Sequence, residues 1–440
     1  MNSQSYQINS FLKKLEVVLS IGLLTIIPTM RSQPRIVELS VSLIIYTFIF
    51  SIFVKSWRRI IYVAFSDWIL LSLCLLAVLS FTWSVNPSST LSELKFLLRG
   101  TIFGIYLALR YSPRDLLRLL AWTAGISMIL SIFMALFIPA YGLHNYDGAL
   151  VWKGIFTHKQ GLGAYMGLSA SIFITHFIDP RSNRWLAGLG LGTAFLLIVL
   201  SDSKTGMSLL LLSLVFIPLY QVVKQQGALR TFLLLSALTL FGVIAMTIVM
   251  NFQTIVVDYM GKDPELTGRV PLWTLAIAKG MEHPILGFGY NGFWSSDASD
   301  IVIFHSWAVR DPYFRDRSIL FHAHNGLVDQ FLQFGFVGLT LFFLSIFTFL
   351  IRVIKLTLIN RSAEDFWGFL FIVIFLFNNV TEGRIILYQD YLWIVYVAWA
   401  YSTALREQFL DHQNKSWLAE RRNQIIPSSL SSKSLLNKVG

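Results

Sequence analysis

About twelve long apolar runs constrain the fold of this chain more than any other feature of its sequence. Of its 440 residues, 55% are hydrophobic and 13% are charged, whereas roughly 25% are charged in soluble domains. A run of ~20 apolar residues can cross a bilayer as a helix. The sequence therefore predicts an all-α, polytopic integral membrane protein with a single membrane domain over residues 1–440. The predicted spans are residues 12–30, 37–54, 67–83, 94–110, 116–139, 161–178, 184–201, 205–223, 230–250, 331–354, 364–381 and 386–405.

Lysine and arginine favour one side of the predicted bilayer. With a cytoplasmic N-terminus, 21 of the 35 cations lie on the cytoplasmic side, and eight lie outside when the six of the longest loop are left aside. Both termini are therefore predicted to be cytoplasmic, and residues 252–330 form one large extracytoplasmic loop. The basic tail over residues 406–440 is predicted to be disordered and close to the membrane. The first apolar run follows Lys13 and Lys14 and is expected to stay as an anchor.

Composition also excludes several classes of site. The net charge of +11 does not indicate nucleic acid, because most cations lie at the ends of apolar runs. The single cysteine, Cys74, excludes internal disulfides and cysteine metal sites. The segment from Gly287 to Gly292 has the letters of a dinucleotide fingerprint but no βαβ context, so its glycines are predicted to form turns. No cofactor is expected.

Polar groups that could carry chemistry gather in the predicted external segments. Val270 to Met281 has helical apolar spacing and is expected to lie on the membrane or cap the bundle. Small residues within the spans, such as Gly163 and Gly192, are expected to allow close helix packing. The candidate residues are His158 and Lys159 before one span, Lys204 in a short turn, Arg269 with Trp273 one helical turn later, and His322, His324 and Asn325 before another span.

Each candidate also has an ordinary structural explanation. Lys204 could extend to the interface, Arg269 could be a plain loop arginine, and His158 could be a satisfied interfacial imidazole. His322 and His324 could ligate a metal, but no carboxylate or third histidine stands at a recognised spacing.

The candidates make chemical sense as a set. Six of the eight histidines are predicted to be external. A helix that opens near Asn325 would direct its positive end at His324, which favours the neutral imidazole that a general base requires. Arginine and lysine bind diphosphate, and arginine can do so with two parallel hydrogen bonds.

At these residues the sequence resembles the O-antigen ligase and polysaccharide polymerase superfamily, and most of all its exopolysaccharide-production branch. The resemblance implies a metal-independent, inverting glycosyltransferase of the multi-span (GT-C-like) type. Such an enzyme acts on undecaprenyl-diphosphate-linked glycans outside the bacterial inner membrane. The segments that carry the resemblance are Gly154–Gly163, Ser201–Gly206, Leu266–Trp273, Pro284–Phe293 and Phe321–Gly338.

The resemblance also implies roles for individual residues. Arg269 would bind the donor diphosphate, and His324 would deprotonate the acceptor hydroxyl. Lys204 stands where many relatives have arginine, and Gln160 where they often have asparagine. Glu382 lies where several polymerase-like members have glutamate, and it could orient sugar or pair with Arg384.

The predicted function is therefore a membrane glycan polymerase. It would join a growing polysaccharide to the next lipid-linked repeat unit in the bilayer, with a chain-length regulator and a flippase as candidate partners. One alternative is a ligase that transfers finished glycan to lipid A core or to a protein. A second is a transporter or flippase, which would distribute charge along the depth of its spans.

Overall fold

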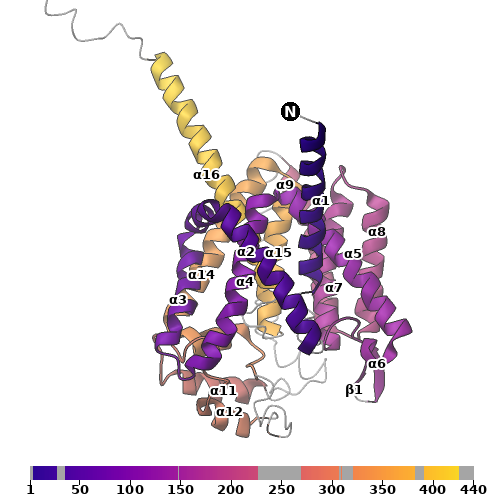
Figure 1. Ribbon diagram of the computed structural model, residues 1–440, viewed down its shortest axis with the longest axis vertical. Helices are drawn as coiled ribbons and strands as arrows, with labels where there is room; N and C mark the ends of the chain where they lie inside the picture. Colours follow the sequence, from indigo (N-terminus) through magenta and orange to yellow (C-terminus); the bar gives the residue numbers. More distant parts are fainter. Residues whose placement is uncertain are drawn as a thin grey trace, which may run out of the picture.

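The computed structural model describes residues 3–26, 35–146, 148–225, 269–306, 309, 321–381 and 391–425. Long helices that run up and down side by side make up most of this part of the chain (Figure 1). They are α1 (Ser3–Ile26), α2 (Arg35–Ser66), α3 (Trp68–Leu79), α4 (Pro87–Arg110), α5 (Pro113–Phe137), α7 (Lys159–Ile178), α8 (Arg184–Leu200), α9 (Lys204–Lys224), α14 (Gly326–Asn360), α15 (Ala363–Thr381) and α16 (Tyr391–Ile425).

These helices coincide with eleven of the predicted runs, and the run over residues 230–250 lies outside the described residues. Five described helices are long and apolar enough to cross a membrane: Pro113–Phe137, Lys159–Ile178, Lys204–Lys224, Gly326–Asn360 and Ala363–Val380. A sixth candidate is the pair Phe53–Ser66 and Trp68–Thr82, which is bent by 106°. An all-α membrane protein is therefore confirmed, whereas twelve spans and a single large loop remain predictions.

The helix ends follow local sequence signals. Asn86 and Ser112 accept hydrogen bonds from Ser89 N–H and Asp115 N–H, and each precedes a proline in the first turn of its helix. The sequence did not predict the β-hairpin of β1 (Leu143–Tyr146) and β2 (Ala149–Trp152), in which Leu143 pairs with Trp152. Its strands are only four residues long, which is too short for a clear alternating pattern.

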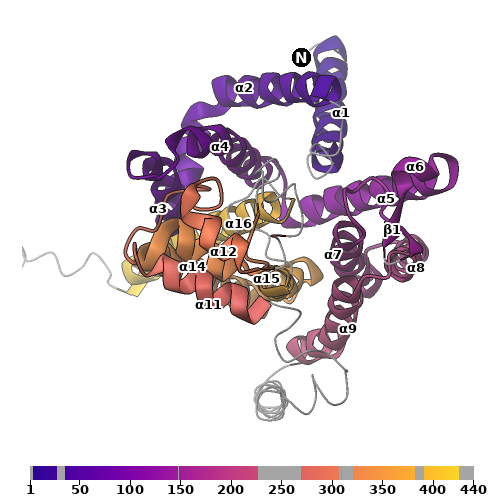
Figure 2. The same ribbon diagram turned by 90° about the horizontal axis from the view of Figure 1, so that it is seen from below.

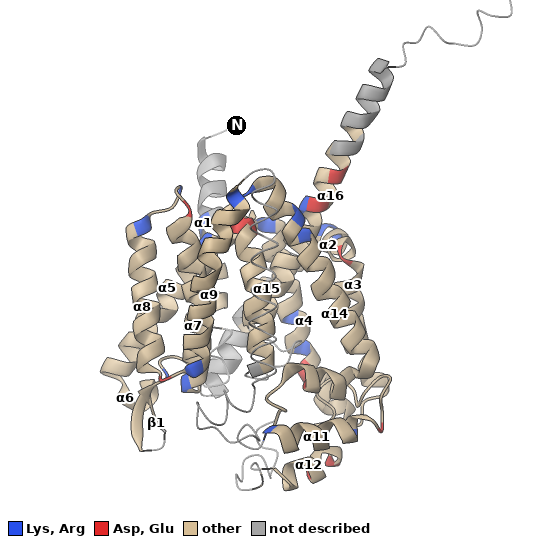
Figure 3. Ribbon diagram, turned by 180° about the vertical axis from the view of Figure 1, so that it is seen from behind, with Lys and Arg blue, Asp and Glu red and all other residues tan. Residues whose placement is uncertain are grey.

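The helices alternate in direction, which sorts the connections onto two ends of the bundle (Figures 1 and 3). We call the end that carries the hairpin, α11 (Arg269–Gly280), α12 (Asp300–Phe304) and residues 321–325 the loop face. We call the other end, where α1 begins and α16 extends away from the bundle, the tail face. Seen from the loop face, α15 lies between a group formed by α5, α7, α8 and α9 and a group that contains α4, α14 and α16 (Figure 2).

Charged residues gather at the tail face (Figure 3). Arg352 pairs with Asp67 and Glu407, and Arg406 pairs with Asp365. These ion pairs hold α16 to α14 and α15 beyond the apolar stretch. Helix α16 continues to Ile425, whereas the sequence predicts a disordered tail from residue 406. Residues 426–440 lie outside the described part.

Helix α14 is broken at Gly335, which has a φ of 59°. A break leaves backbone groups without helical partners, and in a membrane protein these need other partners. The segment from Pro284 to Gly289 supplies them, because Phe288 N–H donates to Leu332 O (2.8 Å) and Phe336 N–H donates to Pro284 O (2.8 Å). Gly287 and Gly289 have φ values of 63° and 86°, so the prediction that these glycines form turns is confirmed.

Candidate functional site

The loop from Phe321 to Asn325 brings two imidazoles together at the loop face. His324 N–H donates to Nδ1 of His322 (3.1 Å), and the ring centroids lie 4.1 Å apart. Because Nδ1 of His322 accepts this bond, a neutral His322 carries its proton on Nε2. His324 itself has a left-handed backbone with a φ of 52°, so the two residues form a tight turn.

Asn325 ends this turn and starts helix α14. Its side-chain oxygen accepts hydrogen bonds from Leu327 N–H (3.0 Å) and Val328 N–H (3.4 Å). A helix therefore begins directly after His324, as the sequence analysis expected. The polar end of the Asn325 side chain is engaged in capping, although the residue was expected to bind substrate.

Helix α11 positions Arg269 near the turn formed by His322, Ala323 and His324 (the histidine turn). The indole N–H of Trp273 donates to Ala323 O (2.7 Å), between the two histidines. Arg269 is the first residue of α11 and lies about one turn before Trp273. Helix α11 also buries Leu272 and Ala276 in a small apolar core with residues between 288 and 332, and Trp273 packs against the same core. The amphipathic helix predicted from Val270 to Met281 is thus present, and it caps the bundle.

The surroundings hold His324 neutral. Burial is the main reason that the pKa of His324 falls from 6.5 to about 3, with smaller contributions from the neighbouring His322 and from the positive charge of Arg269. Burial acts first because it removes the water that would solvate an imidazolium. The contribution of Arg269 also shows that its guanidinium and the imidazole of His324 lie close enough to interact.

A second group of candidates surrounds the first residues of α7 and α9, also at the loop face (Figure 3). His158 caps α7 by accepting from Gln160 N–H (3.3 Å), and its ring lies 5.0 Å from that of His144. The Lys159 ammonium lies 3.0 Å from a carboxylate oxygen of Asp202; the Lys159 side chain is 7% exposed and that of Asp202 is 69% exposed. Lys204 is exposed at the first position of α9.

The structure thus forms two groups from the candidates. Arg269, Trp273, His322, His324 and Asn325 make one, and His158, Lys159 and Lys204 make the other. Glu382 and Arg384 lie outside the described residues. Within the described ranges, no group of three histidine, cysteine, aspartate or glutamate side chains is placed to hold a metal ion.

Sequence reasoning missed several polar residues at or near this face. Asp202 was not recognised as a partner of Lys159, nor Asp329 as a partner of the histidine turn. Arg99 is buried within α4, with its guanidinium 5.0 Å from the ring centroid of Phe96. A charge inside an apolar run was the available signal for Arg99.

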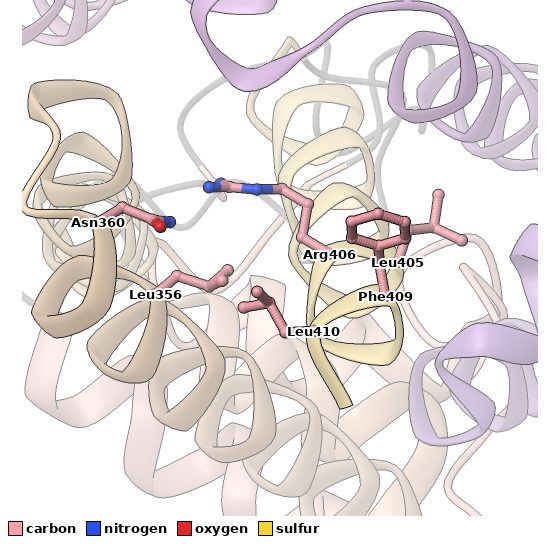
Figure 4. Close-up of a pocket in the computed structure, with 6 residues that line it drawn as sticks. All are labelled: Leu356, Asn360, Leu405, Arg406, Phe409 and Leu410. Atoms are coloured by element: carbon pink, nitrogen blue, oxygen red, sulfur yellow. The ribbon is translucent and has the colours of Figure 1, made fainter. Parts of the chain in front are cut away.

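A small pocket of about 230 Å³ opens at the tail face, between α14 and α16. Figure 4 shows the Arg406 side chain at its edge. That guanidinium already pairs with Asp365, and the histidine turn lies at the other end of the bundle. The pocket therefore does not belong to the candidate site.

The fold and site define a multi-pass helical membrane protein in which the helix that begins with Arg269 is tied, at one face of the bundle, to the turn that carries the neutral His324. A family model described as O-antigen ligase matches residues 189–343, which include α9, α11 and the histidine turn. The exopolysaccharide production protein ExoQ of Rhizobium meliloti (strain 1021) is 23% identical over 273 residues. That match covers 60% of this chain and 60% of the relative's length.

The resemblance to the O-antigen ligase and polysaccharide polymerase superfamily is confirmed by these two matches. Over the matched residues the chain is thus similar to proteins described as O-antigen ligase and as an exopolysaccharide production protein, and it spans 60% of the length of that relative.

Proposed function

We propose that this protein is an inverting, metal-independent membrane glycosyltransferase that polymerises glycan carried on undecaprenyl diphosphate, at the outer surface of the inner membrane. The observation that supports it most is the hydrogen bond from Trp273 to Ala323, because it ties the helix that begins with Arg269 to the turn that carries the neutral His324. A transferase with a diphosphate leaving group needs one group to bind the anion and one to accept a proton.

Arg269 would bind the donor diphosphate. When the acceptor hydroxyl attacks the anomeric carbon, the bond from that carbon to the diphosphate oxygen breaks. Negative charge then develops on the leaving oxygen, and a guanidinium can neutralise it through two parallel hydrogen bonds. Attack from the side opposite the leaving group inverts the anomeric configuration.

His324 would accept the proton of the attacking hydroxyl. Without donor, its pKa of about 3 makes His324 a weak base, because it is buried and lies beside Arg269. A bound diphosphate would cancel the charge of Arg269 and add negative charge nearby, and both effects raise the pKa of His324. Donor binding would therefore strengthen the base only when a substrate is present to react.

The second group, with Lys204 and the Lys159–Asp202 pair, would bind another anionic or sugar part of the two substrates. Lys204 supplies a positive charge without the fork geometry of arginine. Glu382 and Arg384 remain candidates for sugar binding, and a chain-length regulator and a flippase remain candidate partners.

The first test is His324→Ala in a deletion strain. We expect loss of polymer with normal membrane insertion, because the acceptor loses its base. The matched control is His305→Ala, an exposed histidine at the same face, which should leave polymer unchanged. Normal polymer from His324→Ala would remove the base assignment.

The second test is Arg269→Lys. This variant keeps the charge but loses the paired hydrogen bonds, so polymer formation should fall by on the order of 10-fold or more. Lys279→Ala removes a cation from the last turn of the same helix and should have little effect. Full activity of Arg269→Lys would argue against a two-point contact with diphosphate.

The alternative function is that of a ligase, which transfers finished glycan to another acceptor. The family model that matches residues 189–343 is described as O-antigen ligase, which supports this alternative. Lipid-linked intermediates in the deletion strain distinguish the two. Single repeat units accumulate if a polymerase is missing, and long lipid-linked chains accumulate if a ligase is missing.

A further inference from the structure

Asp329 lies in the first turn of α14 and is fully buried. One carboxylate oxygen accepts from the Trp294 indole N–H (2.7 Å) and from Ala323 N–H (3.1 Å). The other oxygen also lies within hydrogen-bonding distance of Ala323 N–H (3.2 Å). Burying a carboxylate among neutral donors costs free energy, so this position calls for a reason beyond packing.

The Ala323 residue that Asp329 binds is held from both sides. Its N–H is bound by Asp329 and its C=O is bound by the Trp273 indole. Ala323 separates His322 from His324. The hydrogen bonds of Ala323 to Asp329 and Trp273 therefore fix the backbone that carries both imidazoles. The left-handed backbone of His324 is unfavourable for a residue with a side chain and persists only where its surroundings enforce it.

We propose that Asp329 is a positioning residue that sets the orientation of the His324 imidazole by binding the Ala323 N–H. This inference rests on the proposed role of His324 as the base. Asp329 acts through the backbone of the turn and does not touch substrate. Trp294 completes the arrangement by orienting the carboxylate, and Trp273 ties the same turn to the helix that carries Arg269.

A merely structural role would have different consequences. If Asp329 only stabilised the fold, its loss would lower thermal stability and the amount of protein, and its effect would add to that of any other variant. A positioning role predicts that the effect disappears once His324 is gone, because nothing is left to orient.

The variant to test is Asp329→Asn in the full chain, with Asp67→Asn as the matched control. Asparagine keeps the volume of Asp329 and one acceptor oxygen, but it replaces the second oxygen, 3.2 Å from Ala323 N–H, by an N–H donor that faces another donor. Asp67 is equally buried but caps α3 at the tail face. Trp294→Phe, which removes only the donor that orients Asp329, provides a second variant should Asp329→Asn not fold.

The first readout is independent of activity. The chain is labelled at its eight histidines, placed in lipid nanodiscs and titrated by nitrogen NMR, with the His324 signal assigned from its absence in His324→Ala. In Asp329→Asn we expect a shifted His324 signal and a pKa that rises toward the ordinary imidazole value of about 6.5 as the turn opens to water. Trp294→Phe should move the signal in the same direction, and Asp67→Asn should not move it.

The second readout is turnover with lipid-linked glycan extracted from the deletion strain. Misplacing a catalytic group costs on the order of 10- to 100-fold in rate, so kcat should fall by that factor in Asp329→Asn while KM stays within about twofold. In the His324→Ala background, the residual turnover measured at high enzyme concentration should not fall further when Asp329→Asn is added.

Opposite results overturn the two ideas separately. An unmoved His324 signal in Asp329→Asn and Trp294→Phe, or losses that add in the double variant, would refute the positioning role. Full activity of His324→Ala would refute the proposed base even if the NMR signal moves as expected.

Discussion

His324 is kept neutral by burial and by a neighbouring cation. Asp329 contacts the N–H of Ala323, one residue earlier in the same turn. This arrangement fixes the backbone around the imidazole. It also couples the protonation of a single side chain to the stability of the fold.

The coupling predicts how stability depends on pH in the absence of substrate. The unfolded chain binds a proton at His324 below about pH 6.5, whereas the folded protein binds it only near pH 3. Between these values the unfolded state holds more protons, so His324 makes the protein less stable as the pH falls. We therefore compare the stability of His324→Asn with that of wild type at two pH values, by thermal unfolding in detergent. The difference should favour the variant more at pH 4.5 than at pH 7.

The control for this prediction is His305→Asn, which changes an exposed histidine of the same face. It should not show the gain at pH 4.5. Equal differences between His324→Asn and wild type at the two pH values would mean that His324 titrates normally in the folded state.

At the scale of helices, the closest contact described is the crossing of α7 and α9. A side-chain carbon on Gly163 would lie 2.0 Å from Cβ of Ser203, and one on Gly206 would lie 2.5 Å from Gly163 O. This crossing holds together the two helices whose first turns carry Lys159 and Lys204. Only glycine allows the two backbones to come this close.

Gly206→Ala should therefore separate α7 from α9. The extra methyl group meets backbone, which cannot move aside, so we expect a loss of about 1–3 kcal/mol in the free energy of unfolding. The matched control is Gly192→Ala in α8, where a Cβ would meet nothing within 4 Å. The measurement is thermal unfolding in detergent. Equal stability of the two variants would contradict the close approach of α7 and α9 at Gly206.

The helices could be predicted well and their contacts could not. Apolar length alone gave eleven helices at nearly the right positions. The role of glycine in packing was right for Gly163, Gly167 and Gly190, but no neighbour approaches Gly192. Composition reveals that a glycine permits close packing and does not reveal which helix, if any, lies opposite.

The same limit applies to the site. Arg269 and His324 stood out because a cation and an imidazole in a polar loop are visible against apolar runs. Asp329 did not, because its role depends on which backbone N–H the fold brings to it. The ion pair of Lys159 and Asp202 was hidden in the same way, since 43 residues of sequence separate its partners.

At the scale of the whole molecule, every candidate among the described residues lies at the loop face, and most ion pairs lie at the tail face (Figure 3). The proposed function requires the loop face to be outside the cell membrane, where the lipid-linked glycan is assembled. The excess of cations on the tail side favours this orientation.

Cysteine labelling tests the orientation directly. In a Cys74→Ala background, Ala149→Cys places a thiol on the exposed hairpin of the loop face, and Gln225→Cys places one just after α9 at the tail face. A membrane-impermeant thiol reagent should label Ala149→Cys in intact cells and Gln225→Cys only after permeabilisation. The reverse pattern would exclude chemistry of these residues on the outer surface.

The hydrogen bond from the Trp273 indole to Ala323 has a consequence for the proposed polymerase, whose product would lengthen with every reaction. It joins the helix that begins with Arg269 to the turn that carries His324, so we expect the two groups to keep their relative position when other helices of the bundle move. The distance between Arg269, which would bind the carrier diphosphate, and His324, which would accept the proton, would then not depend on the length of the glycan. A chain of two units and a chain of a hundred would meet the same reaction geometry.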